Sequence, residues 1–111
     1  MEITVERRDD GLVVVHPAGR LNMVTAGDLR ELIASTITAE NAHVVVDLSA
    51  VSFIDSSGLG ALINGLKSAR EAGGDLRIAA PNDQVRLVLQ LTNLERVLTP
   101  YGTVDSAFAD V

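Results

Sequence analysis

Three short runs of apolar residues, each of strand length, constrain the fold more than any other feature of this sequence. Residues 12–15, 44–48 and 76–80 are apolar almost throughout, which is typical of strands buried on both faces. Segments with apolar residues at helical spacing separate the second run from both of its neighbours. Strands and helices therefore alternate along most of the chain, which predicts right-handed crossovers and a mostly parallel sheet.

The chain is predicted to open with a β-hairpin. Ile3 and Val5 alternate with polar residues, as in a half-exposed strand, and Asp9-Asp10-Gly11 then supplies a strong turn signal. The run 12–15 would be the second strand of the hairpin, and we expect Pro17 to end it.

Four helices are expected. The first would begin at Thr25, which can act as an N-cap. The second, with its apolar stripe at positions 59, 62, 63 and 66, would stop at Gly73-Gly74. The third would begin near Asn82 and the short fourth one after Thr103, with a short last strand at 96–99 between them. The predicted fold is α/β, with a sheet of four to five strands, an N-terminal hairpin and about four helices.

Length, charge and composition narrow the class of protein. A chain of 111 residues fits a single domain, 1–111, and the absence of cysteine excludes disulfides and thiolate sites. A net charge of -6 and an aromatic content of 3% argue against a nucleic-acid partner. No apolar run approaches the roughly 18 residues of a membrane span, and the start does not resemble a signal peptide, so we expect a cytoplasmic protein.

The most informative segment is Asp55-Ser56-Ser57-Gly58-Leu59-Gly60, which joins a predicted strand to the second helix. A side-chain oxygen of Asp55 or Ser56 can cap that helix. Each glycine costs about 1 kcal/mol of helix stability relative to alanine. Gly58 and Gly60 therefore predict a close approach of another backbone or surface, and they would leave the serines uncovered.

Several kinds of site are compatible with serines at a helix start. The segment lacks the glycine spacing of a phosphate-binding loop. A nucleophile elbow is excluded because Ile54 and Asp55, not glycines, stand two residues before the serines. Plain helix capping and regulatory phosphorylation both remain open, since the helix dipole favours an anion at this position.

The same segment, preceded by Phe53-Ile54, resembles the signature of bacterial anti-sigma-factor antagonists of the STAS domain family. The resemblance extends over nearly the whole chain. It implies a binding protein, not an enzyme, that regulates transcription indirectly, for example in a stress response. In that family the unmodified antagonist binds an anti-sigma factor that is also a serine kinase, which frees the sigma factor. The kinase then phosphorylates the antagonist from ATP and releases it, and a metal-dependent serine phosphatase reverses the modification.

The resemblance also implies the residues of the site. The phosphorylated residue would be Ser56, with Ser57 as the second choice, and no cofactor or resident metal is implied. Asn22 stands where the family often has Asp, so a charge is missing there. The expected partner contacts are Asn22, Asp55, Ser56, Ser57, Gly58 and Leu59.

Two other classes of function use folds of this kind. The same fold could serve as an unphosphorylated docking subunit of a transport system. A small α/β enzyme is disfavoured, because the sequence has no supported Ser-His-acid arrangement and no phosphate-binding loop. His16 and His43 also lack the spacing of metal ligands and are interpreted as strand-end or loop residues.

Overall fold

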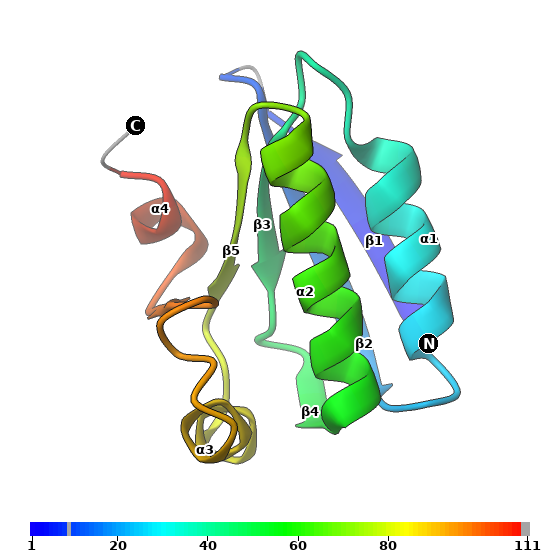
Figure 1. Cartoon of the computed structure of the whole chain (residues 1–111), viewed down its shortest axis with the longest axis vertical. Coiled ribbons are helices and arrows are strands. Elements are labelled where there is room, and N and C mark those ends of the chain that lie inside the picture. Colours follow the sequence, from blue (N-terminus) through cyan, green and yellow to red (C-terminus); the bar gives the residue numbers. More distant parts are fainter. Residues whose placement is uncertain (9, 110–111) are drawn as a thin grey trace.

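Six strands and four helices make up the part of the chain that the computed structural model describes, residues 1–8 and 10–109. The predicted α/β class, the opening hairpin and the four helices are confirmed, and the sheet has six strands in place of the expected four to five (Figure 1). The elements are β1 Glu2–Arg7, β2 Leu12–Leu21, α1 Ala26–Thr36, β3 His43–Asp47, β4 Val51–Ile54, α2 Ser56–Glu71, β5 Asp75–Ala79, α3 Asp83–Leu91, β6 Pro100–Tyr101 and α4 Val104–Ala107.

The sheet is parallel except for its first pair of strands. The strand order is β1-β2-β3-β5-β6, with β1 antiparallel to β2 and the other pairs parallel. The long strand β2 has two successive neighbours on one side. Its residues 12–15 pair with β3, and its residues 19–21 pair with β4. This arrangement brings the ends of β2 and β4 together.

Burial on both faces explains why the central strands are apolar throughout. Val13 and Val15 belong to the main core, on the face that α1 and α2 cover (Figure 1). Leu12 and Val14 point to a smaller cluster on the other face, which Ala107 of α4 closes. Residues 12–15 of β2 and 44–46 of β3 are therefore buried and apolar on both faces of the sheet.

The expectation that Pro17 ends the second strand is wrong. Pro17 is paired with Ile3 of β1 inside β2, which continues to Leu21. On its other side, the pairing with β3 stops at Val15 and the pairing with β4 starts at Gly19. Pro17 therefore lies in a gap between two partner strands, where the missing N–H of proline costs no ladder hydrogen bond.

The predicted strand at 96–99 is also wrong. This segment forms a turn in which the N–H of Leu98 donates to the carbonyl of Leu94 at 2.8 Å, and the short β6 begins only at Pro100. Leu98 is fully buried. The turn places its side chain in the core, so Leu98 is buried without strand pairing.

The turns and caps of the other elements largely follow the predictions. In the hairpin turn, the N–H of Leu12 donates to Asp10 Oδ1 at 3.0 Å and Gly11 has a φ of +85°, while Asp9 lies outside the described residues. Asn82 caps α3 through the N–H of Val85, and Thr103 caps α4. Across residues 1–8 and 10–109, no helix is long and apolar enough to cross a membrane.

Candidate functional site

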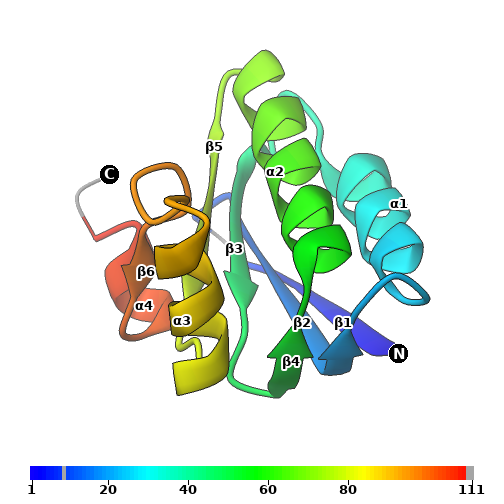
Figure 2. The same cartoon turned by 60° about the horizontal axis from the view of Figure 1, so that its bottom comes forward.

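The site lies where β2 and β4 end side by side. Leu21 and Ile54, the last residues of these strands, are register partners, and the N–H of Asp55 donates to the carbonyl of Leu21 at 3.2 Å. Asn22 and Asp55 each follow directly. The loop that leads to α1 and the first turn of α2 therefore emerge from the same edge of the sheet (Figure 2).

Asp55 is the residue that caps α2. Its backbone is extended, and its Oδ1 accepts a hydrogen bond from the N–H of Gly58 at 3.0 Å. Its carbonyl accepts the N–H of Leu59, also at 3.0 Å. Of the two capping residues that the sequence allows, the structure selects Asp55 and leaves Ser56 without that task.

Ser56 is exposed at the first position of α2, whereas Ser57 is half-buried. Within the described ranges 1–8 and 10–109, neither the hydroxyl nor the backbone N–H of Ser56 has a hydrogen-bond partner in the chain. The free N–H groups of a first helical turn carry partial positive charge. Ser56 thus presents an uncommitted hydroxyl at the end of the helix that best tolerates an anion.

The two glycines of the segment have opposite surroundings. A Cβ on Gly58 would lie 2.6 Å from the carbonyl oxygen of Leu21 and 2.7 Å from Cγ1 of Ile54, so the predicted close approach is confirmed there. A Cβ on Gly60 would meet no atom within 4 Å, and Gly60 is exposed. The close approach expected at Gly60 is therefore wrong for contacts inside this chain.

The loop from β2 to α1 is held by a side-chain network around Asn22. Its Oδ1 accepts hydrogen bonds from the N–H groups of Val24, at 3.0 Å, and Thr25, at 3.3 Å. Thr25 Oγ1 accepts from the N–H of Asn22 at 3.0 Å and donates to the carbonyl of Arg20 at 2.7 Å. Thr25 occupies the N-cap position of α1 but makes no capping hydrogen bond, so its predicted capping role is wrong.

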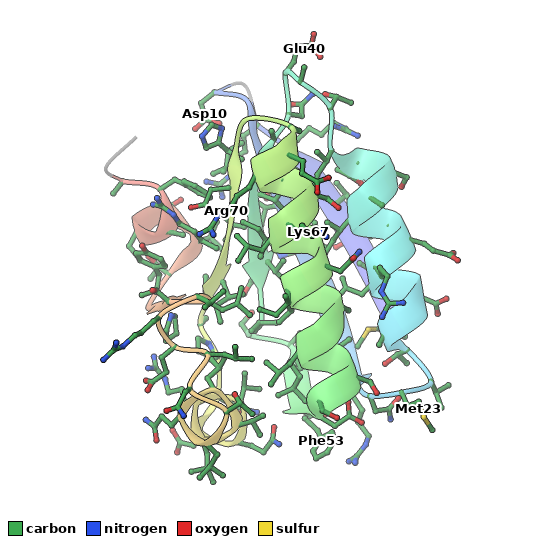
Figure 3. The ribbon with its side chains drawn as sticks, in the orientation of Figure 1. Asp10, Met23, Glu40, Phe53, Lys67 and Arg70 are labelled. Carbon is green, nitrogen blue, oxygen red and sulfur yellow. The ribbon has the colours of Figure 1, made fainter. Side chains whose placement is uncertain are left out.

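This loop displays two apolar side chains that the sequence analysis missed. Met23 and Val24 are 78% and 82% exposed. Met23 lies at the same end of the molecule as the first turn of α2, as does Phe53, whereas Asp10 and Glu40 lie at the opposite end (Figure 3). The sequence signal that could have revealed this exposed pair is that both residues are apolar and adjacent, and belong to no predicted strand and to no helix stripe.

The residues predicted to contact a partner fall into two groups, one at the surface and one buried. Ser56 is exposed, and Asn22, Asp55 and Ser57 are half-buried at the surface. Leu59 is only 3% exposed and belongs to the main core, and Gly58 is buried. The side chain of Leu59 therefore fixes α2 to the sheet and is not available to a partner.

A cation–π pair lies on the strands that lead into the site. The guanidinium of Arg20 lies 4.3 Å from the centroid of the Phe53 ring, and these two residues are register partners on β2 and β4. Both precede the site by a few residues. Arg20 therefore adds a positive charge to the strands that lead into the site, and Asp55 adds a negative charge where β4 ends.

His16 lies inside β2 and not at a strand end as expected. Its Nδ1 is 3.0 Å from Asp47 Oδ2, and its Nε2 is 3.4 Å from Glu6 Oε1. Partial burial acts to raise the pKa of Asp47, but the hydrogen bonds from Ser49 and with His16 outweigh it and hold that pKa below its ordinary value. This cluster links three neighbouring strands, which is a structural role.

Comparison with known proteins assigns the chain to a family. The STAS domain family matches residues 3–107. A Thermotoga maritima protein provisionally named an anti-sigma factor antagonist is 33% identical over 92% of this chain and 91% of the relative. The anti-sigma-B factor antagonist of Listeria monocytogenes is 26% identical over 88% of this chain and 86% of its own. The crystal structure of an anti-sigma factor antagonist from Mycobacterium paratuberculosis has 32% identity and a TM-score of 0.86, covering 99% of this chain and 92% of the other.

More distant structures share the fold alone. The Bacillus cell fate determinant SpoIIAA, solved in its phosphorylated form, has 21% identity and a TM-score of 0.73, covering 98% of both chains. A sulfate transporter family protein from Wolinella succinogenes has 19% identity and a TM-score of 0.75, covering 90% of this chain and 84% of the other. The fold therefore occurs in proteins with different names and tasks.

Proposed function

This chain belongs to the STAS domain family, and we propose that it is an anti-sigma-factor antagonist that phosphorylation of Ser56 switches off. Its partner would be an anti-sigma factor that is also a serine kinase, and a serine phosphatase would restore the unmodified form. The relatives named anti-sigma factor antagonists support this class of function. The chain would act in the cytoplasm by binding, not by catalysis.

The observation that carries the proposal is the division of tasks between Asp55 and Ser56. Asp55 satisfies the backbone of the first turn, and the hydroxyl of Ser56 is exposed and uncommitted. A kinase can therefore reach this oxygen without breaking a cap. Ser57 is half-buried and is the weaker candidate.

The modification would be an ordinary phosphoryl transfer. Ser56 Oγ attacks the γ-phosphorus of ATP held by the kinase, a new O–P bond forms, and the bond to the β-phosphate oxygen breaks. ADP leaves, and the hydroxyl proton goes to a base of the kinase. In the phosphatase step, water attacks the phosphorus and the Oγ–P bond breaks. Inorganic phosphate leaves, and Oγ takes up a proton, which restores the serine hydroxyl.

The phosphate would weaken partner binding through charge and desolvation. It adds about -1.5 to -2 charges beside the carboxylate of Asp55, on a surface that the partner covers. Within the free chain, the N–H groups of the first turn of α2 accommodate the anion. If the phosphate makes the binding free energy about 3 kcal/mol less favourable, the affinity falls roughly 150-fold.

The surface around Ser56 contains both polar and apolar anchors. Asp55 and Ser57 flank Ser56 in the chain, Asn22 follows the neighbouring strand end, and the exposed Met23 and Val24 come next to Asn22 in the loop. The side-chain oxygen of Asn22 is already used inside the loop, so its NH₂ group would face the partner. Recognition at this position would then use a hydrogen bond in place of the ion pair that an Asp allows.

The proposal is tested with three variants and the purified serine-kinase anti-sigma factor of the same organism. Ser56→Ala should bind the kinase like the natural chain and resist release by ATP. Ser56→Asp should bind poorly, and Ser57→Ala should bind and still be released. Equal affinity of Ser56→Ala and Ser56→Asp would refute the mechanism. If no variant bound, the alternative of an unphosphorylated docking subunit in a transport system would be favoured.

A further inference from the structure

One edge of β4 is occupied by side chains and not by a strand. In the part of the chain that the structure describes, β2 is the only strand that pairs with β4. The opposite edge of β4 faces the start of α3. Unpaired N–H and C=O groups at such an edge need other partners.

Gln84 supplies two of these partners with a single side chain. The N–H of Ile54 donates to Gln84 Oε1 at 2.9 Å, and Gln84 Nε2 donates to the carbonyl of Ile54, also at 2.9 Å. The amide thus reproduces the paired hydrogen bonds that a neighbouring strand would make. Asn82 makes a second link, because its Nδ2 lies 3.2 Å from the carbonyl oxygens of both Val51 and Ser52.

The link through Gln84 ends next to the proposed phosphorylation site. Ile54 is fully buried, and its backbone continues directly into Asp55. Asp55 in turn binds the carbonyl of Leu21 and the N–H of Gly58. The two hydrogen bonds from Gln84 to Ile54, the peptide link from Ile54 to Asp55 and the capping bond of Asp55 therefore connect α3 to the first turn of α2.

We propose that Gln84 is a positioning residue of the switch, which couples the start of α3 to the turn that carries Ser56. This inference rests on the proposed role of Ser56. A phosphate there repels the Asp55 carboxylate and competes with it for the N–H groups of the first turn of α2. Any shift of Asp55 moves the backbone of Ile54, and the two bonds to Gln84 transmit that shift to α3.

The coupling is measured by amide hydrogen exchange on the full chain with serine or with phosphoserine at position 56. The phosphoserine is installed during synthesis, so no kinase is needed. In the natural sequence we expect phosphoserine to change exchange by about threefold or more in the first turn of α2 and in the first turn of α3. The methionine side chain of Gln84→Met has a similar length but cannot make these hydrogen bonds. In this variant the effect of phosphoserine on exchange should persist in α2 and disappear in α3.

The matched control is Asn82→Asp. It removes the donor to Val51 and Ser52 but keeps the oxygen that caps α3, and it leaves Ile54 untouched. The phosphoserine effect on α3 should survive in this variant. A purely structural role of Gln84 would raise exchange equally with and without phosphate, so the difference between the two forms would stay unchanged.

Each outcome decides the role of Gln84. An α3 response that is absent from the natural sequence, or equal in Gln84→Met, overturns the coupling. A Ser56 that is never phosphorylated in cells would defeat the proposed function instead, and that result comes from a different measurement. The two failures are therefore distinguishable.

Discussion

At the start of α2, neighbouring residues have separate tasks. Asp55 and Gly58 build the turn, through a capping hydrogen bond and a close contact with Leu21. Ser56 and Gly60, four residues apart and so on one face of the helix, are exposed and make no such contacts. The segment therefore has an inner side that fixes the fold and an outer side that is free for a partner.

The two glycines allow a direct test of this division. Gly58→Ala should destabilise the protein by about 1–3 kcal/mol, because the added methyl group would collide with the backbone of β2. Gly60→Ala should stabilise it by about 1 kcal/mol through helix propensity, yet weaken the complex with the kinase. Chemical denaturation and binding titrations measure the two effects. A Gly60→Ala variant that gained stability and kept full affinity would place Gly60 outside the interface.

Asp47 predicts how stability depends on pH. Its pKa in the folded protein lies below the ordinary value of 3.8, so its contribution is present above that value and is lost as the pH falls through the folded pKa. At pH 7, Asp47→Asn should therefore lower the free energy of unfolding by about 1 kcal/mol. The difference in the free energy of unfolding between the natural protein and this variant should shrink as the pH is lowered below about 4. A difference that stays constant down to pH 2 would show that the carboxylate contributes nothing through its charge.

The sequence predicted the local structure of the candidate site but not the tasks of its residues. The string from Asp55 to Gly60 indicated a helix start with exposed serine, which the structure shares. Capping by Asp55 and not by Ser56 depends on local backbone geometry, which the sequence leaves open. Gln84 was not predicted at all, since its partner Ile54 lies 30 residues away in the chain.

At the scale of elements, the continuous apolar runs and the stripes of apolar residues at helical spacing were the reliable signals. The strands β2, β3 and β5 were predicted because burial on both faces leaves a continuous apolar run, and the helices α1, α2 and α3 because burial on one face leaves a stripe at helical spacing. The short β4 was missed, because four residues joined directly to a helix carry too little periodicity. The segment 96–99 was predicted as a strand but is a turn that buries Leu98, since burial alone does not distinguish a strand from a turn.

The turn around Leu98 should be a stability determinant in spite of its irregular backbone. Leu98 is fully buried, whereas the adjacent Val97 is 41% exposed. Leu98→Ala should cost about 2–5 kcal/mol, the range for a large-to-small change in a packed core. Val97→Ala should change stability by about 0.5 kcal/mol or less. Urea denaturation measures the free energy of unfolding of both variants. A similar loss in Leu98→Ala and Val97→Ala would contradict the assignment of Leu98 as the residue that anchors this turn.

At the scale of the whole molecule, one end of the sheet collects the exposed groups that a partner can use. The loop with Met23 and Val24 and the first turn of α2 both follow strands that end at this edge (Figure 2). The net charge of -6 acts against self-association of the free chain. In the proposed complex, the apolar pair would provide contact area that is desolvated on binding.

The apolar pair should matter for binding and not for folding. Changing both Met23 and Val24 to serine should leave stability within about 0.5 kcal/mol and lower the affinity for the kinase about tenfold or more. Leu91→Ser is the control, since Leu91 is 73% exposed on α3, similar to the 78% of Met23. Calorimetric titration should show no loss for the control. An equal loss for both variants would indicate a general effect of surface hydrophobicity.

The central claim is that Ser56 carries a reversible phosphate. The direct measurement is phosphosite mapping by mass spectrometry, on the chain isolated from its own cells in growth and under stress, with phosphatases inhibited. The account predicts a single phosphate on Ser56 whose occupancy changes between the two conditions. A chain that is unmodified at Ser56 in every condition, or modified at Ser57 alone, would contradict it.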